Sequence, residues 1–482
     1  MTLKEALEQS RSMRFFAEIS RIPRGSFTEE KIVDYIEAFA KERGLWYQRD
    51  AIHNILIRKE ASPGREAEPP LVLQAHTDMV WNKEPGNNHD FTKDPIEFVE
   101  KDGWLSANGT TLGADDGAGV SNILAILDEP DLSHPTLECI FTVQEENGMG
   151  GARSIDLSCF SGKRMIGLDG ILEGSTIYSA TDVWTGVLRH TYDPEPADGT
   201  AYRLSVSNLT SGHGALMIGS GRANAIKLAA RVLAALRDVR LVSYEGGGLV
   251  HVIPGACEVT FVSELTADEL NAAAEPVIRE VKNEYAETDP DACITLAKAD
   301  PASCAGSAPK ALSPGDSRKL LTMLELIPVG AQRRTPSKLE QVEGSYNLSI
   351  IHLNEGAFEC TYVARTNWPA SIGHMRDDAL LFAELFDMTA ETKMAYPGHH
   401  VPTDSPLTKV WNDVYREDTG KEIVLSFLHS GLDSGYIFQK MKLEDLIVLM
   451  PTTLDVHTPK ERVNIDSYVR TYEYLKKIVE RC

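Results

Sequence analysis

The stretch "LVLQAHTDMVW", residues 71–81, begins as a buried strand and then changes character. Leu71, Val72 and Leu73 suit the interior of a sheet, whereas His76 and Asp78 follow within a few residues. Strand ends form the usual ligand crevice of an α/β sheet. An apolar strand that ends on a histidine and a carboxylate therefore marks a candidate functional site.

The composition is that of a large globular protein without affinity for polyanions. Its 482 residues exceed what one core usually serves, so at least two domains are expected. With 42% hydrophobic residues, the chain can bury substantial cores. The formal net charge of −23 argues against nucleic acid or an anionic membrane surface as a partner.

The sequence shows neither a targeting segment nor a membrane span. Residues 1–20 have the pattern of one amphipathic helix with charges of both signs, unlike a signal peptide. No apolar run approaches the ~18 residues that predict a transmembrane helix. The seven cysteines are scattered and form no CxxC motif, which excludes a cysteine zinc knuckle and indicates free thiols in a reducing compartment. We expect a cytoplasmic protein.

Helical and strand patterns alternate through residues 1–185. Alternation of this kind predicts an α/β sheet with helices on its faces. The tail, residues 400–482, has the same character. Helices are expected over 29–45, 116–130 and 467–482, and strands over 71–75, 137–145, 164–170 and 443–453.

Residues 186–399 differ in sequence pattern from the regions on either side, and they contain an internal echo, that is, two pairs of similar segments. Residues 224–236 resemble 316–328, and residues 250–265 resemble 351–366. The second alignment places His251 opposite His352. Each half has the pattern of a helix followed by strands, which predicts two similar units joined through residues 289–316.

Metal-ligating side chains follow several of the predicted strands. A single aspartate after a strand is usually a turn or a helix cap, and a pair of glutamates is usually solvated. Together, five strand ends that supply only His, Asp and Glu indicate a dinuclear oxygen and nitrogen metal site. These residues are His76 with Asp78, Asp115, Glu145 with Glu146, Asp169 and His457.

The motifs around these residues resemble those of a known family. "AHTDMV", "TTLGADDGAG", "TVQEENGMGGA", "LDG", "SGHGALMIGSGRANAIK", "YPG", "HSGLDSG" and "HTPKERV" occur in the order seen in aminoacyl-histidine dipeptidases. These enzymes, also called cytosolic non-specific dipeptidases, belong to the di-zinc peptidase and deacylase superfamily. The resemblance spans nearly the whole chain. It implies a catalytic domain with a mixed sheet flanked by helices, in two parts (1–185 and 400–482), and an inserted α+β lid domain (186–399).

The resemblance also implies a role for each ligand. His76 and Asp169 resemble the ligands of one metal ion, Glu146 and His457 those of the second, and Asp115 the carboxylate that bridges both. Zn²⁺ is expected, and Co²⁺ or Mn²⁺ would also suit these ligands.

Two further side chains resemble catalytic groups of the family. Glu145 resembles the general base of the family. This base takes a proton from the water between the two metal ions, which leaves hydroxide, and delivers that proton to the leaving amine. Asp78 shares a face with His76 and resembles the partner that fixes its ring. The peptide bond between Asp115 and Asp116 is expected to be cis, as in relatives.

The resemblance extends to substrate contacts in the lid. His213 resembles a lid histidine that stabilises the developing oxyanion, although a turn residue in a glycine-rich loop has the same pattern. Arg365 resembles the residue that binds the substrate's terminal carboxylate, although a solvated arginine at a strand end is an equal alternative. His429 lies in a family motif that contributes to the substrate pocket.

Three positions depart from the family pattern. His251, also a candidate substrate contact, stands where relatives carry Asn, His399 where Trp is frequent, and Asp433 where Glu is common. None is a metal ligand, so the departures concern specificity and not hydrolysis.

We therefore predict a metal-dependent dipeptidase, acting on Xaa-His or on a broad range of dipeptides, and a homodimer. An N-acyl-amino-acid deacylase or carboxypeptidase would share the metals and Glu145. A metal-binding scaffold without catalysis would have no use for Glu145. Serine, cysteine and nucleotide chemistry is disfavoured, because GxSxG and GxxxxGK[ST] motifs are absent from the sequence. A lid of two similar units would equally imitate a dimer within one chain.

Overall fold

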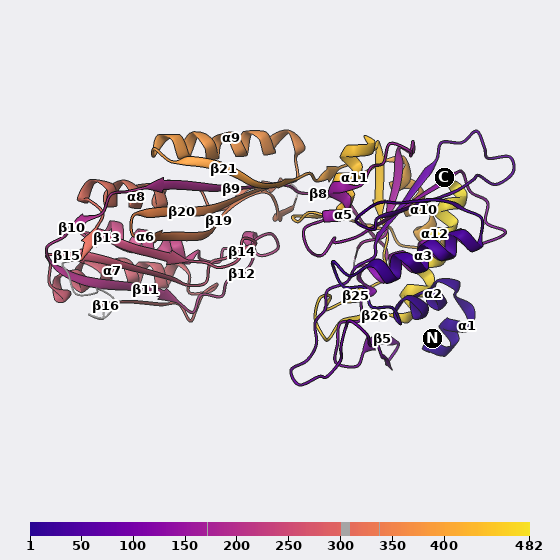
Figure 1. The fold of residues 1–482 in the computed structure, drawn as a ribbon, viewed down its shortest axis with the longest axis horizontal. Coiled ribbons are helices and arrows are strands. Elements are labelled where there is room, and N and C mark those ends of the chain that lie inside the picture. Colours follow the sequence, from indigo (N-terminus) through magenta and orange to yellow (C-terminus); the bar gives the residue numbers. More distant parts are fainter. Residues whose placement is uncertain (171, 300–308, 337) are drawn as a thin grey trace. The chain divides into compact units, whose positions relative to one another are not determined.

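The computed structural model describes residues 1–170, 172–299, 309–336 and 338–482, which form two compact units (Figure 1). Unit 1 comprises Met1–Ala180 and Pro397–Cys482, and unit 2 comprises Thr181–Tyr396. Part of the expected connection, residues 300–308 with Cys304, lies outside the described residues.

Unit 1 is built on a six-stranded mixed sheet. Its central strands run parallel to one another, and two antiparallel strands extend one side. The order is β1 (Trp46–Arg49), β2 (Ile55–Lys59), β6 (Leu137–Thr142), β3 (Leu71–His76), β7 (Arg164–Gly167) and β24 (Asp445–Val448). The expected strands are present. β6, β7 and β24 are shorter than their patterns, whereas β3 extends one residue further, to His76.

Both faces of this sheet are covered, which explains its nearly continuous apolar strands. On β2, Ile55 and Ile57 belong to one core and Leu56 to another. The larger core lies under α1 (Leu3–Gln9), α2 (Arg11–Ile19), α3 (Glu30–Glu42), α4 (Ala114–Leu127), α10 (Pro406–Thr419) and α12 (Ile465–Arg481). The smaller core receives Ile437 and Met441 of α11 (Asp433–Met441) and lies near α5 (Gly150–Ser154).

The expectation of one helix over residues 1–20 is wrong. Ser10 has extended backbone, with φ −107° and ψ 120°, and divides the segment into α1 and α2. Its side chain accepts a hydrogen bond from Met13 N and so caps α2. A serine oxygen competes for backbone donors, and here it starts a second helix within an amphipathic pattern.

Two smaller sheets complete unit 1. One contains β22 (His399–His400), β8 (Ser175–Ala180) and β23 (Val424–Leu428). The other contains β25 (Thr453–Leu454), β26 (Arg462–Asn464), β5 (Trp104–Ala107) and β4 (Phe98–Lys101). The second sheet brings the tail of the chain beside the segment that leads into α4.

Unit 2 is built on a nine-stranded antiparallel sheet. The order is β16 (Cys293–Lys298), β11 (Thr200–Ser207), β15 (Cys257–Ser263), β13 (Arg240–Gly246), β19 (Lys338–Asn354), β20 (Ala357–Thr366), β9 (Asp182–Thr191) and β21 (Thr389–Tyr396), with β18 (Gly330–Thr335) also on β19. Its core is shared with α6 (Ala225–Ala234), α7 (Ala267–Glu284), α8 (Pro314–Leu326) and α9 (Pro369–Leu385). Shorter elements are β10 (Glu195–Pro196), β12 (Gly212–His213), η1 (Ile218–Ser220), β14 (Val252–Ile253) and β17 (Lys310–Ala311).

The two halves of unit 2 have the same element order. One half runs α6, β13, β15, α7, β16, and the other runs α8, β19, β20, α9, β21, with β18 added. The halves meet at the antiparallel pair β13–β19, where Glu245 lies opposite His352. The echo in the sequence therefore corresponds to a repeated helix-and-hairpin arrangement around the middle of one sheet (Figure 1).

Within the described residues, no helix is both long and apolar enough to cross a membrane. The six described cysteines are all free.

Candidate metal centre

The predicted ligands of unit 1 follow parallel strands of the main sheet. His76 ends β3, Glu145 and Glu146 follow β6, and Asp169 follows β7. These three strands are neighbours and parallel, so their carboxyl ends lie at one edge of the sheet. His457 comes later in the chain. It lies in the connection from β25 to β26, two strands of the smaller sheet that also contains β5.

Asp115 lies between two imidazoles. Its Oδ1 is 3.2 Å from Nε2 of His76, and its Oδ2 is 3.1 Å from Nε2 of His457. Asp115 stands at the beginning of α4 with non-helical backbone (φ −84°, ψ 110°). A carboxylate with each oxygen facing a different histidine has the arrangement needed to bridge two ions.

The other carboxylates complete this cluster. His457 Nε2 also lies 3.0 Å from Oε1 of Glu146. One ligand atom each from His76, Asp115 and Glu146 lies within 4.8 Å of the others. Asp169 interacts electrostatically with Asp115, Glu146 and His76, so it belongs to the same group.

The cluster holds more negative charge than the protein can bury unaided. Burial raises the pKa of Glu145 well above its usual range, and the charge of Asp169 raises it further. Burial, followed by the charge of Asp115, raises the pKa of Asp169 to about 7. Burial, with further carboxylates nearby, also raises the pKa of Asp433 to about 7. Divalent cations would relieve this repulsion, and imidazole with carboxylate is a donor set that suits them, so the residues fit a pair of metal ions.

Asp78 supports both sides of the centre. Its Oδ1 lies 3.4 Å from Nδ1 of His76 and accepts a hydrogen bond from Glu145 N at 3.0 Å. Its Oδ2 accepts from Glu146 N at 3.2 Å and from Ser26 Oγ at 2.7 Å. Gln144 has left-handed backbone (φ 58°), so the extended chain turns just before the two glutamates. Neighbouring glutamates are thus held on one turn by one buried carboxylate.

Asp116 has a structural role. Its Oδ2 accepts from His76 N at 2.9 Å, and its Oδ1 accepts from Gly119 N at 3.0 Å. The bond between Asp115 and Asp116 is cis, as expected.

Three supporting residues were not predicted from the sequence. Ser26 donates to Asp78, Arg24 donates to the carbonyls of Thr77 and Asp78, and Glu461 accepts from backbone amides that precede α4. Ser26 and Arg24 lie in the loop after α2, where polar residues are ordinary. Glu461 stood in a quoted motif, "HTPKERV", but no local pattern distinguished it from a solvated charge.

The predicted substrate-contact residues of unit 2 lie near one another. The rings of His213 and His251 have centroids 5.6 Å apart. Burial, with the charges of Arg365 and then His251, lowers the pKa of His213 to about 4. Nδ1 of His213 accepts from Ala215 N at 3.2 Å, so the proton of the neutral ring lies on Nε2. Arg365 is buried and donates to the hydroxyl of Tyr396 at 3.2 Å.

His429, His399 and Asp433 lie in unit 1 and are buried. Asp433 begins α11, and its charge acts on Glu145 and Asp169. His399 packs in a neighbouring position, where its ring contacts Ser434 and the carbonyl of Ile177.

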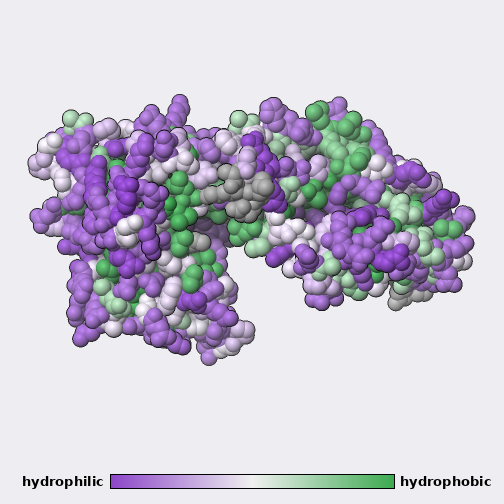
Figure 2. Space-filling view, turned by 180° about the vertical axis from the view of Figure 1, so that it is seen from behind, coloured by the Kyte–Doolittle hydropathy of each residue, from purple (hydrophilic) through white to green (hydrophobic). Residues whose placement is uncertain are grey.

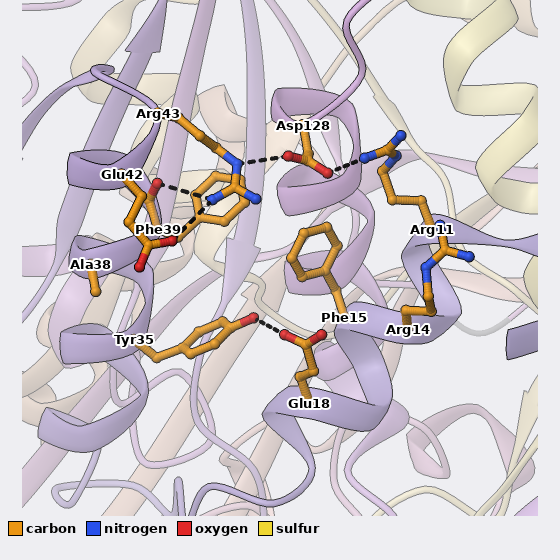
Figure 3. Close-up of a pocket in the computed structure, with 10 residues that line it drawn as sticks. All are labelled: Arg11, Arg14, Phe15, Glu18, Tyr35, Ala38, Phe39, Glu42, Arg43 and Asp128. Atoms are coloured by element: carbon orange, nitrogen blue, oxygen red, sulfur yellow. Dashed lines mark hydrogen bonds and ion pairs between the residues drawn. The ribbon is translucent and has the colours of Figure 1, made fainter.

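A cavity of about 330 Å³ lies elsewhere in unit 1, between α2, α3 and the end of α4 (Figure 3). It contains none of the predicted site residues. Its charged groups pair with one another: Arg11 and Arg43 both bind Asp128, and Tyr35 donates to Glu18. The candidate site is therefore the cluster around Asp115 and not this cavity.

Comparison with known proteins agrees with this geometry. The model of peptidase family M20/M25/M40 matches residues 72–481. The chain belongs to this family. The cytosol non-specific dipeptidase of Escherichia coli (strain K12) is 30% identical to this M20 chain over 471 residues, which are 96% of each protein.

Solved structures extend the comparison to the fold. The crystal structure of aminoacylhistidine dipeptidase from Vibrio alginolyticus matches this M20 chain with a TM-score of 0.88 and 28% identity, over 99% of this chain and 98% of that one. The aminopeptidase PepT of Bacillus cereus matches with a TM-score of 0.54 and 16% identity, over 98% of each chain. The second likeness shows the fold alone. The chain is thus a metal-dependent peptidase with the M20 fold.

Proposed function

We propose that this protein hydrolyses dipeptides at the cluster around Asp115, with unit 1 as the catalytic domain and unit 2 as the lid. The observation that carries the proposal is the bridging position of Asp115 between His76 and His457, with Glu145 held beside them by Asp78. The dipeptide as substrate is supported by the two similar proteins, whose names are those of dipeptidases.

The chain would hold two divalent ions. His76 and Asp169 would ligate one, Glu146 and His457 the other, and Asp115 both. When bound, such a pair polarises the peptide carbonyl and lowers the pKa of an attacking water. Zn²⁺, Co²⁺ and Mn²⁺ all suit these side chains.

Glu145 would move the proton. Its side chain is half-buried, and its backbone amide is anchored by Asp78, which keeps the residue beside the cluster. It would take a proton from the attacking water and give it to the departing amine, the two transfers that peptide hydrolysis requires.

Unit 2 would supply substrate contacts. The neutral ring of His213, with its proton on Nε2, is suited to donate to the oxygen that becomes negative. The guanidinium of Arg365 is suited to bind the terminal carboxylate through its planar fork. His251 and His429 would contact the side chains of the substrate.

Two broader expectations belong to the same proposal. A cytoplasmic location is supported by the described free cysteines and by the name of the Escherichia coli relative. A homodimer is supported by α9, on which Leu381 is 59% and Leu385 76% exposed. Exposed leucines on one helix beside the sheet-edge strand β21 suit a second copy of the chain.

The test is a turnover assay on protein reconstituted with Zn²⁺, Co²⁺ or Mn²⁺. Ala-His, β-Ala-His, Cys-Gly, Leu-Gly-Gly and N-acetyl-Met are offered side by side, with Glu145→Gln as the matched variant. Cleavage of the dipeptides is expected, and the variant should lose about a hundredfold to ten-thousandfold in kcat while it keeps its metal.

Other outcomes separate the alternatives. Release of acetate from N-acetyl-Met with all dipeptides untouched would identify a deacylase. Wild-type protein that binds metal but turns over none of the substrates, and that behaves like the Glu145→Gln variant, would identify a non-catalytic scaffold.

A further inference from the structure

Glu461 is a buried carboxylate that serves the backbone of the bridging loop. It is 2% exposed. Its Oε2 accepts from Leu112 N at 2.9 Å and Gly113 N at 3.0 Å, and its Oε1 accepts from Ala114 N at 2.8 Å and Asp115 N at 3.3 Å. Four successive amides that lead into α4 therefore point at one side chain from the other end of the chain.

The amides of this loop need such a partner because the local acceptor, Asp116, binds Gly119 N further along α4. Gly113 occupies the cap position of α4 with φ 71° and has no side chain to accept from the helix amides. The first amides of a helix have no intrahelical acceptor and favour a negative charge. Glu461 supplies acceptors for the amides just before and at the start of α4, where the backbone of Asp115 and Asp116 is still non-helical.

The same side chain is joined by a short turn to a second ligand. Glu461 N donates to Thr458 O at 3.0 Å, and Thr458 Oγ1 donates to Asp455 O at 2.7 Å. His457 lies inside this turn with left-handed backbone, φ 65°. The turn sets the path from His457 to Glu461, and the carboxylate sets the distance from Glu461 to Asp115.

Arg24 holds the opposite side of the loop. This buried guanidinium donates to the carbonyl of Gly113 and to the carbonyls of Thr77 and Asp78. Its positive charge lies near Glu461, whose pKa burial nevertheless raises to about 7. The peptide of Gly113 is thus held from its N–H by Glu461 and from its C=O by Arg24.

We infer that Glu461 is a positioning residue of the metal centre, which sets Asp115 and His457 at the separation that two ions require. Both of its oxygens are directed at amides, so its effect on metal passes through the backbone and not through ligation. The inference rests on the proposed metal site and deepens it. Partners that orient metal ligands typically contribute tenfold to hundredfold in affinity.

The test compares Glu461→Gln with Glu138→Gln. Glu138 is also 2% exposed in unit 1 and accepts from Ser161 N and Gly162 N, but it contacts no ligand residue. The glutamine in Glu461→Gln places an NH2 group against two N–H donors. Zn²⁺ titration of metal-depleted protein by calorimetry should show about tenfold to hundredfold weaker binding for Glu461→Gln and wild-type binding for Glu138→Gln.

A second readout needs no metal. Hydrogen exchange of the amides of residues 112–115 in metal-depleted protein should accelerate in Glu461→Gln and stay unchanged in Glu138→Gln. If Glu461→Gln fails to fold, Glu461→Asp takes its place. The shorter side chain keeps the charge and should weaken metal binding less than the loss of charge does.

The outcomes keep the two proposals apart. Wild-type protein that binds no divalent ion would overturn the proposed metal site itself. Metal binding of wild-type strength in Glu461→Gln, with faster exchange at residues 112–115, would leave Glu461 as a helix cap only and overturn the inference.

Discussion

Asp78 shows how much one buried carboxylate organises in this protein. Its two oxygens face the ring of His76, two amides of the glutamate turn and the hydroxyl of Ser26. The sequence predicted the contact with His76 from the spacing on the strand and from the family resemblance. It did not predict the amide contacts, because they depend on the turn at Gln144.

Replacing Asp78 with Asn should weaken metal binding and catalysis together. The amide has the same shape as the carboxylate. However, it lacks the negative charge that holds the His76 ring, and its NH2 group cannot accept the hydrogen bonds that one carboxylate oxygen accepts. We expect about tenfold to hundredfold weaker metal binding by calorimetry. Asp50→Asn is the matched control, since Asp50 also accepts from two turn amides in unit 1. Equal effects of both substitutions would mean that Asp78 contributes only to folding.

His399 should make stability depend on pH. Burial lowers its pKa from 6.5 to about 4, and the hydrogen bond to Ile177 O opposes this only in part. The unfolded chain therefore binds a proton at higher pH than the folded chain does. Stability from this group is complete above the unfolded pKa and is lost as the pH falls from about 6.5 to about 4.

The measurement compares wild type with His399→Gln by urea titration. Between about pH 7.5 and about pH 5, wild type should lose roughly 2 kcal/mol more free energy of unfolding than the variant. The difference between the two proteins isolates this group from the many carboxylates. Parallel pH profiles would show that His399 does not titrate with folding.

At the scale of elements, helices and strands form where their patterns predict, and their ends are set by particular side chains. Pro314 begins α8 after the cap Ser313, and Gly420 ends α10 in left-handed backbone. Residues 250–265, where the repeat predicted strands, form two of them. β14 and β15 are separated at Pro254–Ala256. Proline removes a ladder donor there, which the apolar pattern conceals.

Asn224 caps α6 and also ties it to the sheet. Its Oδ1 accepts from Ile226 N at 3.1 Å, and its Nδ2 donates to Leu348 O at 2.8 Å. Asn224→Ala should lower the melting temperature of unit 2 by about 2–6 °C, because a lost cap costs about 1–2 kcal/mol. Asn271→Ala, at an exposed site within α7, is the control for differential scanning calorimetry. No shift in Asn224→Ala would show that the α6 cap adds no stability.

At the scale of the molecule, the repeat in unit 2 leaves apolar side chains of α9 exposed. Leu380, Leu381 and Leu385 of α9 are exposed, and α9 lies beside the edge strand β21. Figure 2 shows this face as an apolar patch at the upper right. An apolar patch beside a strand edge is typical of an interface.

The double substitution Leu381→Glu with Leu385→Glu should therefore separate the proposed homodimer into monomers. Light scattering after size-exclusion chromatography gives the mass, and circular dichroism checks the fold. Leu326→Glu, at a site 62% exposed on α8, should leave the mass unchanged. A wild-type protein that is already monomeric would instead favour a lid whose two halves imitate a dimer.

The sequence by itself determined the kind of fold and indicated which residues would ligate metal. Apolar strands with His, Asp or Glu at their ends are local patterns, and parallel strands bring their ends to one edge. The cluster of His, Asp and Glu side chains and the repeat in unit 2 follow from such patterns, and the family follows from the resemblance of its motifs.

Only the tertiary structure decided how the ligands are held. Glu461 reaches Asp115 across 346 residues, and Arg24 meets the same loop from the first helices. No local sequence pattern predicts these contacts, because the hydrogen-bond donors around a buried charge come together only when the chain folds. The physical reason is that a ligand's chemistry resides in its own side chain, whereas its position depends on hydrogen bonds from distant parts of the chain.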